Sequence, residues 1–412
     1  MSITIRETVK DKRILIWGYG REGKSSEKYI KEYCEPRSVE VLEGSIEDII
    51  ERDYDLIIKS PGIKMMDYEP INKKKYTSQT ELFLNQYRDQ VIGITGTKGK
   101  STTSSMMAHV LSECSGKKTL LMGNIGLPCF DYCDQIDEET LIVFELSCHQ
   151  MMHTKVSPHV AVFLNLYEDH LDYYHSMDAY FAAKSHITTY QQEGDFFFKG
   201  ENVPEINTKA STSIVTNGEV KNVPLKVFGE HNQLNATFVR RVARDVYGCN
   251  DDAITEALAT FTGLPHRLQH IGNYAGIDWY DDSISTIPEA AVGALKSIPG
   301  VRTILIGGMD RGIDYDFLED YMAEHDDFNY ICMYESGKRV HDEFMYKFPG
   351  IRNAGAGRNI IYVNNLDLAV QKAAEITEKG SGCVLSPAAA SYGYFKNFED
   401  RGDRFADMVR AL

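Results

Sequence analysis

The chain alternates short apolar runs with longer amphipathic stretches, and most apolar runs end in glycine, serine or acidic residues. The run VIGIT at residues 91–95 is apolar and β-branched throughout, as expected for a buried parallel strand. After Ser101 the pattern changes to a helical period, with Met106 and Val110 on one apolar stripe. Because such strand-then-helix units recur along the whole chain, the pattern predicts an α/β protein with parallel sheets.

The order of these units suggests more than one domain. A chain of 412 residues is long for a single core, so two or three α/β domains are expected. The first block predicts strands in RILIW and YDLIIK, and the third predicts strands in GIDWYDDS, VRTILIGG and GCVLSPAAAS. Since ligands bind at the carboxyl ends of parallel strands, we expect a ligand edge in the first and third blocks as well as in the second.

The second block opens with a glycine loop, Gly96-Thr97-Lys98-Gly99-Lys100-Ser101, directly after VIGIT. It resembles a phosphate-binding loop shortened to G-x-x-G-K-S, because Ile94 stands where the usual spacing requires glycine. Backbone N–H groups at the start of the following helix would bind an anion. Lys100 would reach the β- and γ-phosphates and the Ser101 hydroxyl would bind magnesium. The alternative is a tight turn whose lysines are merely solvated.

The first block carries a second glycine turn, G-x-G-x-x-G, at Gly18, Gly20 and Gly23. This pattern is usually associated with dinucleotides, but alone it is weak evidence, and the same turn can hold any diphosphate. A stiff Ser60-Pro61-Gly62 turn follows a later strand of the same block.

Polar side chains end two further apolar runs of the second block. Glu145 is the single acid in TLIVFE, and an acid there is costly unless it is paired or bound to a metal. The run HVAVF leads into an acidic segment that is either a solvated loop or a magnesium shell, with Asn165, Glu168, Asp169, His170 and Asp172. Lys184 lies on an apolar patch of a predicted helix, where a lysine usually reaches to solvent.

The composition narrows the class of protein. The net charge of −16 argues against nucleic acid or an anionic membrane as a partner. The chain has no apolar run long enough for a membrane span and no signal-peptide pattern at its start. Eight scattered cysteines without a C-x-x-C pair indicate reduced thiols and a cytoplasmic protein.

Together the motifs resemble the Mur ligases, the ATP-dependent enzymes that add amino acids during peptidoglycan synthesis. The resemblance rests on segments that occur in the family's order along almost the whole chain: GTKGKS, GNIG, FELS, EDHLD, AAK, GEHN, GLPHR, DDS and LSPAAAS…FKNFEDRG. It implies three domains: a Rossmann-like UDP-binding domain at 1–90, a central P-loop ATPase domain with a parallel sheet at 91–263, and a C-terminal Rossmann-like domain at 264–412. The first and last segments are most similar to members that add D-glutamate to UDP-N-acetylmuramoyl-L-alanine.

The resemblance also implies roles for individual residues. The implied catalytic residues are Lys100, Glu145, His170 and Lys184. The implied ATP-binding residues are Gly96, Thr97, Lys98, Gly99, Lys100, Ser101, Thr102, Asn232, Asn235, Arg267 and Asp282, and His266 belongs to the same motif as Arg267. The implied residues for the UDP substrate are Gly20, Arg21, Glu22, Ser60, Pro61, Gly62 and Asn124. The implied residues for the amino acid are Thr286, Arg311, Ser391, Tyr392 and Phe398. Ser101 and Glu145 would bind one magnesium ion, and His170 with Lys184 as a carbamate would bind a second.

At two positions expected to contact the incoming amino acid, the sequence differs from the pattern usual in the D-glutamate enzymes. Ile284 stands where the D-glutamate enzymes usually carry lysine, and Tyr392 replaces a smaller apolar residue. Glutamate is expected, but L-glutamate is an alternative to the D form. Three other readings are a folylpolyglutamate-like ligase, a non-catalytic relative and a nicotinamide-dependent dehydrogenase. The UDP-type first block argues against the folate enzyme, and the intact lysines and acids argue against a non-catalytic protein. A monomer is expected.

Overall fold

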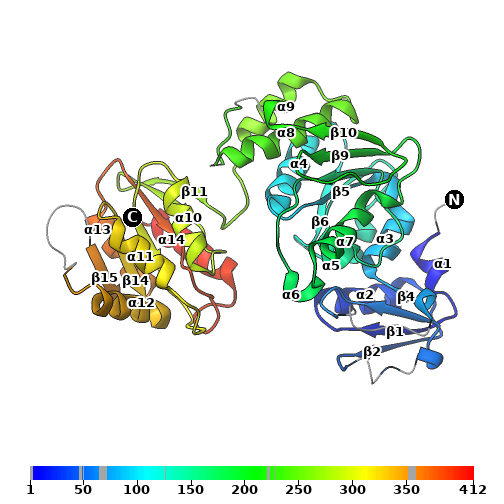
Figure 1. Ribbon diagram of the computed structural model, residues 1–412, viewed down its shortest axis with the longest axis horizontal. Helices are drawn as coiled ribbons and strands as arrows, with labels where there is room; N and C mark the ends of the chain where they lie inside the picture. The colour runs from blue at the N-terminus through cyan, green and yellow to red at the C-terminus, as the bar shows by residue number, and fades with distance from the viewer. Residues whose placement is uncertain are drawn as a thin grey trace. The chain divides into compact units, whose positions relative to one another are not determined.

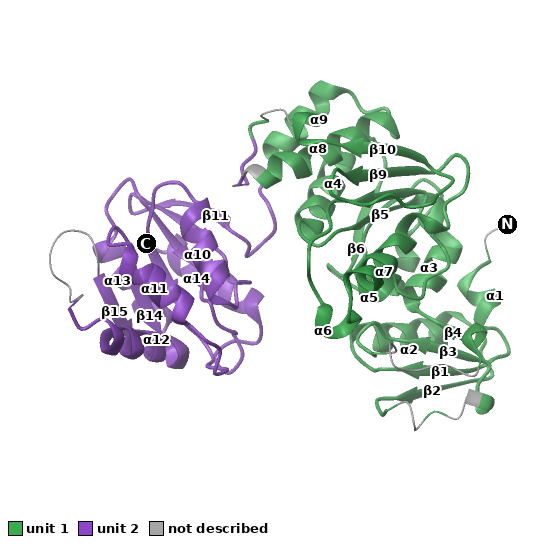
Figure 2. Cartoon of the chain, in the orientation of Figure 1, with its two compact units in different colours: residues 1–224, 230–260 green, residues 225–229, 261–412 purple. Residues whose placement is uncertain are grey.

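The structure is a computed structural model that describes residues 3–45, 49, 51–64, 72–125, 127–219, 223–227, 229–350 and 359–412. The chain forms two compact units (Figure 2). Unit 1 contains Met1–Pro224 and Glu230–Thr260, and unit 2 contains Leu225–Gly229 and Phe261–Leu412. Each unit is described by itself.

The first sheet of unit 1 has four parallel strands in the order β2-β1-β3-β4 (Figure 1). Its strands are β1 (Arg13–Trp17), β2 (Ser38–Leu42), β3 (Leu56–Lys59) and β4 (Tyr76–Thr77), and the accompanying helices are α1 (Ile5–Val9), α2 (Arg21–Tyr33) and α3 (Gln79–Tyr87). Trp17 and Lys59 are paired at the ends of β1 and β3. The glycine turn after β1 and the Ser60-Pro61-Gly62 turn after β3 therefore leave the sheet side by side.

The second sheet of unit 1 has six parallel strands in the order β10-β9-β8-β5-β7-β6. Its strands are β5 (Val91–Thr95), β6 (Thr119–Gly123), β7 (Leu141–Glu145), β8 (Val160–Phe163), β9 (Phe196–Gly200) and β10 (Ser211–Val215). Its helices are α4 (Lys100–Cys114), α5 (Cys148–Met151), α6 (Leu171–Tyr174), α7 (Met177–Thr189), α8 (Glu230–Asp245) and α9 (Asp251–Thr260). Because β5 lies between β7 and β8, the glycine loop, Glu145 and the segment after β8 meet at one edge.

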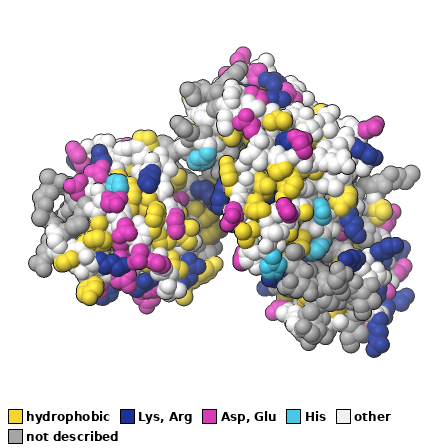
Figure 3. Space-filling model, in the orientation of Figure 1, with side chains coloured by type: hydrophobic (Ala, Val, Ile, Leu, Met, Phe, Trp, Pro, Cys, Tyr) yellow, Lys and Arg dark blue, Asp and Glu magenta, His cyan; other side chains and the backbone are white. Residues whose placement is uncertain are grey.

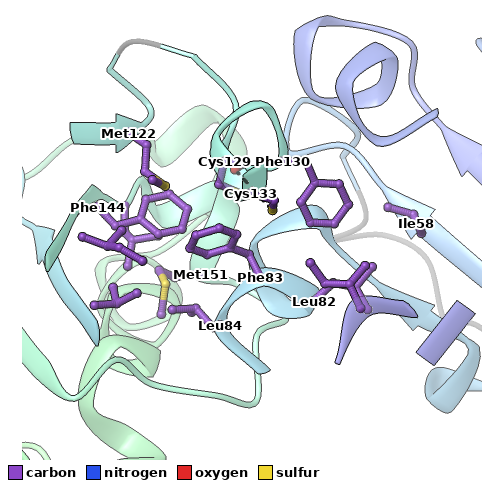
Figure 4. Close-up of a cluster of buried hydrophobic side chains, with 14 of the residues drawn as sticks. Ile58, Leu82, Phe83, Leu84, Met122, Cys129, Phe130, Cys133, Phe144 and Met151 are labelled. Carbon is purple, nitrogen blue, oxygen red and sulfur yellow. Dashed lines mark hydrogen bonds between the residues drawn. The ribbon is translucent and has the colours of Figure 1, made fainter. Parts of the chain in front are cut away.

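One apolar core joins the two sheets of unit 1. It includes Ile16 and Ile58 from the first sheet and Phe144 and Phe163 from the second. Phe83 of α3 packs edge-on against Phe144, with ring centroids 5.6 Å apart, in the cluster drawn in Figure 4. The shared core explains why both sheets belong to one compact unit.

Unit 2 is built on a six-stranded sheet in the order β11-β12-β16-β13-β14-β15. Its strands are β11 (Gln269–Tyr274), β12 (Ile277–Asp281), β13 (Val301–Ile306), β14 (Asn329–Met333), β15 (Asn359–Val363) and β16 (Gly382–Leu385). Its helices are α10 (Pro288–Ser297), α11 (Asp316–Glu324), α12 (Tyr334–Lys347), α13 (Leu366–Ile376) and α14 (Phe398–Arg410). All pairings are parallel except β11 with β12, an antiparallel hairpin that the sequence pattern did not predict.

The predicted α/β class with parallel sheets is confirmed, and the strands predicted in the third block lie next to one another as β12, β16 and β13. The boundaries at 90/91 and 263/264 stay predictions. Within the described part of the chain, every helix is too short or too polar to cross a bilayer. On the face shown in Figure 3, acidic and basic side chains are interspersed.

Candidate functional site

The carbonyl oxygens of the glycine loop after β5 face the ammonium group of Lys100, which belongs to the same loop. Gly99 has φ +84°, a left-handed conformation that glycine adopts without strain, and this allows the chain to turn directly into α4. The Lys100 ammonium donates to the carbonyl oxygens of Gly96 and Thr97, at 3.0 Å each. Burial lowers the pKa of Lys100, while Glu145 acts in the opposite direction. Ser101 and Thr102 lie in the first turn of α4, as a phosphate-binding loop requires.

The segment after β8 holds this loop in place. The backbone N–H of Lys98 donates to Asn165 Oδ1 at 2.9 Å, and Asn165 Nδ2 donates back to the Lys98 carbonyl oxygen at 3.0 Å. The Thr97 hydroxyl donates to the carbonyl oxygen of Tyr167. The amide of Asn165, which the sequence suggested for a magnesium shell, therefore supports the loop, while Asp169 pairs with Lys98 at 3.5 Å.

Helix α8 approaches the loop from the other side. A Cβ atom at Gly99 would lie 2.9 Å from Asn235 Oδ1, so only glycine allows this contact. Asn235 Nδ2 donates to Asn232 Oδ1 at 2.9 Å, and both side chains are buried. The structure thus brings both predicted asparagines to the glycine loop.

Lys184 of α7 is buried in the same place. Its side chain is 1% exposed, and its ammonium donates to the Gly96 carbonyl oxygen at 2.9 Å above the face of Tyr180. Burial is the main cause that lowers the pKa of Lys184 to about 8, and the charge of Lys100 contributes in the same direction. The expectation that a lysine on this patch reaches to solvent, which was the alternative to a functional role, is wrong.

Glu145 is the last residue of β7, and in the described part of the chain only one of its two carboxylate oxygens accepts a hydrogen bond. Oε1 accepts a 2.8 Å hydrogen bond from Asn124 Nδ2, whereas Oε2 is buried without a hydrogen-bond partner. An orphaned buried carboxylate oxygen fits a hard cation such as Mg²⁺. Among the described residues no three His, Cys, Asp or Glu side chains group around one metal position, so hydroxyl, carbamate and phosphate oxygens would have to complete such a shell.

Lys100, Lys184 and Asn124 line a pocket of about 370 Å³. Its lining joins predicted catalytic residues to predicted UDP-substrate residues and consists of Pro61, Gly62, Lys100, Asn124, Ser147, Cys148, His149, His170, Tyr173 and Lys184. Gly126, the last residue of the GNIG motif, lies outside the described residues.

His149 packs within this lining. Its ring lies edge-on to Tyr173 and His170, with centroid distances of 4.5 and 5.1 Å. Burial lowers the pKa of His149 to about 4, so the ring is neutral at pH 7. His170 has a left-handed φ of +54° that places its half-exposed ring at the pocket.

The glycine turn and the Ser60-Pro61-Gly62 turn enclose a second pocket of about 520 Å³. Ser60 Oγ donates to the Gly18 carbonyl oxygen at 2.7 Å, and a Cβ atom at Gly18 would lie 2.9 Å from Ser60 Cβ. The lining is Gly18, Tyr19, Gly20, Arg21, Glu22, Glu43, Ser60, Pro61, Gly62 and Ile63. Six predicted UDP-substrate residues thus share one pocket, and Pro61 and Gly62 also line the pocket of about 370 Å³.

In unit 2, acidic residues at the end of β12 are held by a buried network. Asp282 Oδ2 accepts from Ser386 Oγ at 2.7 Å, and burial raises the pKa of Asp282 to about 6. Asp281 Oδ2 lies 2.7 Å from His266 Nδ1, which raises the pKa of His266. Arg267 follows directly in the chain, and its charge acts on Asp282.

The predicted amino-acid residues lie on the loops after β12, β13 and β16. Arg311 Nη2 donates to the Thr286 carbonyl oxygen at 3.1 Å, which brings these two loops together. Ser391 is buried, whereas Tyr392 is 63% exposed. Phe398 begins α14, and its carbonyl oxygen accepts from Ser283 Oγ at 2.8 Å.

Sequence reasoning missed Arg401, a fully buried guanidinium in α14. Its Nε and Nη2 donate to Ser283 Oγ and the Ser283 carbonyl oxygen at 2.9 and 2.7 Å, and Nη1 donates to the Ala389 carbonyl oxygen at 3.1 Å. Arg401 thus joins the loops after β12 and β16. The available signal was its spacing, because it stands on the same helical stripe as Phe405 and Val409.

Lys59 at the end of β3 was also missed, and its side chain is 5% exposed. The signal was a lysine within an otherwise apolar strand.

Comparison with known proteins agrees with this geometry. The Mur ligase middle domain family matches residues 94–200. UDP-N-acetylmuramoylalanine–D-glutamate ligase of Streptococcus agalactiae is 32% identical over 462 aligned positions, which cover 98% of each chain.

Among solved structures, UDP-N-acetylmuramate-alanine ligase from Thermotoga maritima has a TM-score of 0.59 at 19% identity, covering 97% of this chain and 99% of that one. MurF ligase from Thermotoga maritima, solved in complex with ADP, has a TM-score of 0.53 at 17% identity. The match covers 98% of this chain and 96% of that one. These two similarities show the fold, and the relative from Streptococcus agalactiae shows the family. The chain belongs to the Mur ligase family, as its motifs indicated.

Proposed function

We propose that this chain joins D-glutamate to UDP-N-acetylmuramoyl-L-alanine, with hydrolysis of ATP to ADP and phosphate, in peptidoglycan precursor synthesis. The observation that carries the proposal is that Lys100 and Lys184 line one pocket of about 370 Å³ together with Pro61 and Gly62 of the turn after β3. A phosphate-binding loop and a diphosphate-binding turn thus face the same space, as an ATP-dependent reaction of a UDP-linked carboxylate requires.

The chemistry follows from the need to activate a carboxylate. The carboxylate of the UDP-linked substrate attacks the γ-phosphorus of ATP, which forms an acyl phosphate and releases ADP. The amine of glutamate then attacks the acyl carbon, loses a proton and displaces phosphate, which leaves an amide. Phosphoryl transfer asks the protein mainly for positioning and charge neutralisation. Lys100 supplies positive charge, the N–H groups at the start of α4 hold phosphate oxygens, and Asn232 and Asn235 contact the nucleotide from α8.

Residues of the same site fit two magnesium ions. Ser101 and Glu145 would hold one ion, and His170 with Lys184 as a carbamate would hold the other. Magnesium supplies charge neutralisation at the phosphate oxygens. An ammonium cannot bind a metal, but a lysine whose pKa is near 8 is a neutral amine more often than an exposed one, and the neutral amine is the form that adds CO₂.

The amino acid is proposed to bind unit 2 through Arg311, Thr286 and the Ser391 loop. Arg311 is the cation placed on the loop after β13, and a guanidinium binds a carboxylate through two hydrogen bonds. L-glutamate is the second candidate, because Ile284 and the exposed Tyr392 depart from the residues usual in the D-glutamate enzymes. All eight cysteines are free, which suits the cytoplasm, and we propose that the enzyme acts there as a monomer.

The decisive experiment is phosphate release from ATP and magnesium with UDP-N-acetylmuramoyl-L-alanine and each candidate amino acid, with the product mass measured in parallel. We expect phosphate release and a product one glutamate residue heavier. Phosphate release that does not depend on the UDP substrate would contradict the proposal, as would a product containing another amino acid.

A further inference from the structure

Lys59 is buried next to the Ser60-Pro61-Gly62 turn and Glu22 lines the pocket of about 520 Å³, and among the described residues the two side chains form no direct ion pair. Within the part of the chain that the structure describes, the Lys59 ammonium donates one hydrogen bond, to the carbonyl oxygen of Ser60 at 3.1 Å. Glu22 Oε1 accepts from Gln150 Nε2 at 2.8 Å, and Glu22 Oε2 is buried without a partner. Each group therefore keeps hydrogen-bonding capacity that the protein does not use.

The two charges nevertheless act on each other. The pKa of Lys59 is lowered to about 8, because burial lowers it by more than the charge of Glu22 raises it. Burial raises the pKa of Glu22, and the hydrogen bond from Gln150 and the charge of Lys59 lower it. Removing one member of such a pair leaves an uncompensated charge at low dielectric.

The lining of the pocket of about 520 Å³ carries more negative than positive charge, which is unfavourable for binding a diphosphate. Among the described residues, its lining carries one cation, Arg21, and two carboxylates, Glu22 and Glu43. A nucleoside diphosphate brings at least two negative charges, and the N-terminus of α2 supplies only partial positive charge. Another cation is therefore required close to Glu22.

Lys59 is placed to meet this requirement and to hold the turn that forms the pocket wall. Its ammonium donates to the Ser60 carbonyl oxygen, while the Ser60 hydroxyl donates to Gly18 in the glycine turn. A buried charge is screened less by salt than an exposed one, so its field extends into the pocket.

We propose that Lys59 is a positioning residue for the nucleoside diphosphate part of the substrate. Its buried charge offsets Glu22, so that the glycine turn accepts a diphosphate, and its hydrogen bond fixes the Ser60-Pro61-Gly62 turn against Gly18. The proposal rests on the proposed function, since it assumes that a UDP-linked substrate occupies this pocket.

The test is UDP binding to the full chain by calorimetry, with ADP binding as an internal control for the glycine loop after β5. We expect Lys59→Met to weaken UDP binding about tenfold or more while ADP binding changes less than about twofold. Methionine keeps the length and the apolar stem of lysine. Lys75→Met is the matched control, because Lys75 also donates to a backbone carbonyl beside the first sheet, but that carbonyl belongs to Tyr54 rather than to the Ser60-Pro61-Gly62 turn. It should bind UDP as the wild type does.

The double variant separates charge from packing. Glu22→Gln should bind UDP more tightly than the wild type, and Glu22→Gln with Lys59→Met should recover most of the affinity lost in Lys59→Met. Wild-type UDP affinity in Lys59→Met would overturn the proposal, and so would a loss that Glu22→Gln does not restore. If the wild type binds ADP but not UDP, the proposed substrate is wrong instead. Loss of ADP binding in Lys59→Met would show a general folding defect and overturn the specific role.

Discussion

Lys100 and Lys184 donate hydrogen bonds to the same acceptor, the carbonyl oxygen of Gly96, at 3.0 and 2.9 Å. Two ammonium groups that share one oxygen repel each other, and burial strengthens this repulsion because the charges are poorly screened. The arrangement is relieved when one group becomes neutral or negative. Carbamylation of Lys184 would replace the repulsion with an attraction to Lys100 and would supply an anionic metal ligand in the same step.

We therefore expect Lys184→Ala to lose activity by about 100-fold or more, the scale of a lost catalytic electrostatic contact. Added acetate or another short carboxylate should restore part of the rate, because it can occupy the space of the carbamate. Phosphate release is the measurement, and ¹³C-bicarbonate should give a carbamate signal in wild type that Lys184→Ala lacks. A Lys184→Ala enzyme with wild-type rate would contradict the role.

Lys100→Met should reduce phosphate release by about 100-fold or more, because Lys100 is expected to neutralise charge on the transferred phosphoryl group. Lys98→Ala is the matched control in the same loop. The Lys98 side chain is 74% exposed, and the loop is held by its backbone rather than by its ammonium. The rate of phosphate release by Lys98→Ala should fall less than about tenfold. Equal losses in the two variants would show that the loop tolerates no change rather than that Lys100 acts on the phosphate.

Arg401→Met should destabilise unit 2 and weaken amino-acid binding. The change removes the donors to the carbonyl oxygens of Ser283 and Ala389 in the interior, which costs about 1–3 kcal/mol for each group. Urea unfolding followed by tryptophan fluorescence measures the effect, with Trp279 reporting on the core of unit 2 and Trp17 on unit 1. Arg410→Met is the control on the same helix, since its side chain is 53% exposed. Its unfolding free energy should change by less than about 0.5 kcal/mol.

The contrast between Lys100 and Arg401 shows what the sequence could predict. The glycine loop depends on adjacent residues between a strand and a helix, so local pattern was sufficient to predict it. Arg401 shares a helical stripe with Phe405 and Val409, which indicates burial, but its partner Ser283 is 118 residues away and could not be predicted from the local pattern. The role of Lys59 also depends on a distant residue, because the charge that acts on it belongs to Glu22 of α2, which the local pattern around Lys59 does not indicate. The order β12-β16-β13 likewise depends on long-range pairing, although the polar ends of those strands were predicted.

Asp282 should make the stability of unit 2 fall as the pH rises. Its pKa is raised to about 6 in the folded chain from about 4 in the unfolded chain. The unfolded chain therefore loses this proton first, and the folded state is penalised progressively between about pH 4 and pH 6, by about 2–3 kcal/mol in total. Asp282→Asn should remove this part of the slope. The measurement is the unfolding free energy of both proteins at pH 4, 5, 6 and 7, and parallel curves would contradict the shift.

The last prediction concerns the amino acid. Glutamate brings two carboxylates to unit 2, and each needs a cation or several hydrogen-bond donors when it leaves water. Arg311 is held across two loops by the Thr286 carbonyl oxygen, so its guanidinium is positioned before the ligand arrives. Arg311→Ala should raise the KM for glutamate about 10- to 100-fold, while the KM values for ATP and the UDP substrate change little. Arg302→Ala is the control, because Arg302 lies near the start of β13, away from the Arg311 loop, and pairs with Asp327, and this variant should leave all three KM values unchanged. D-glutamate should be preferred to L-glutamate, D-aspartate and L-lysine in side-by-side rates. Preference for L-glutamate would reverse the handedness, preference for lysine would change the substrate class, and an unaffected Arg311→Ala would remove that residue from the site.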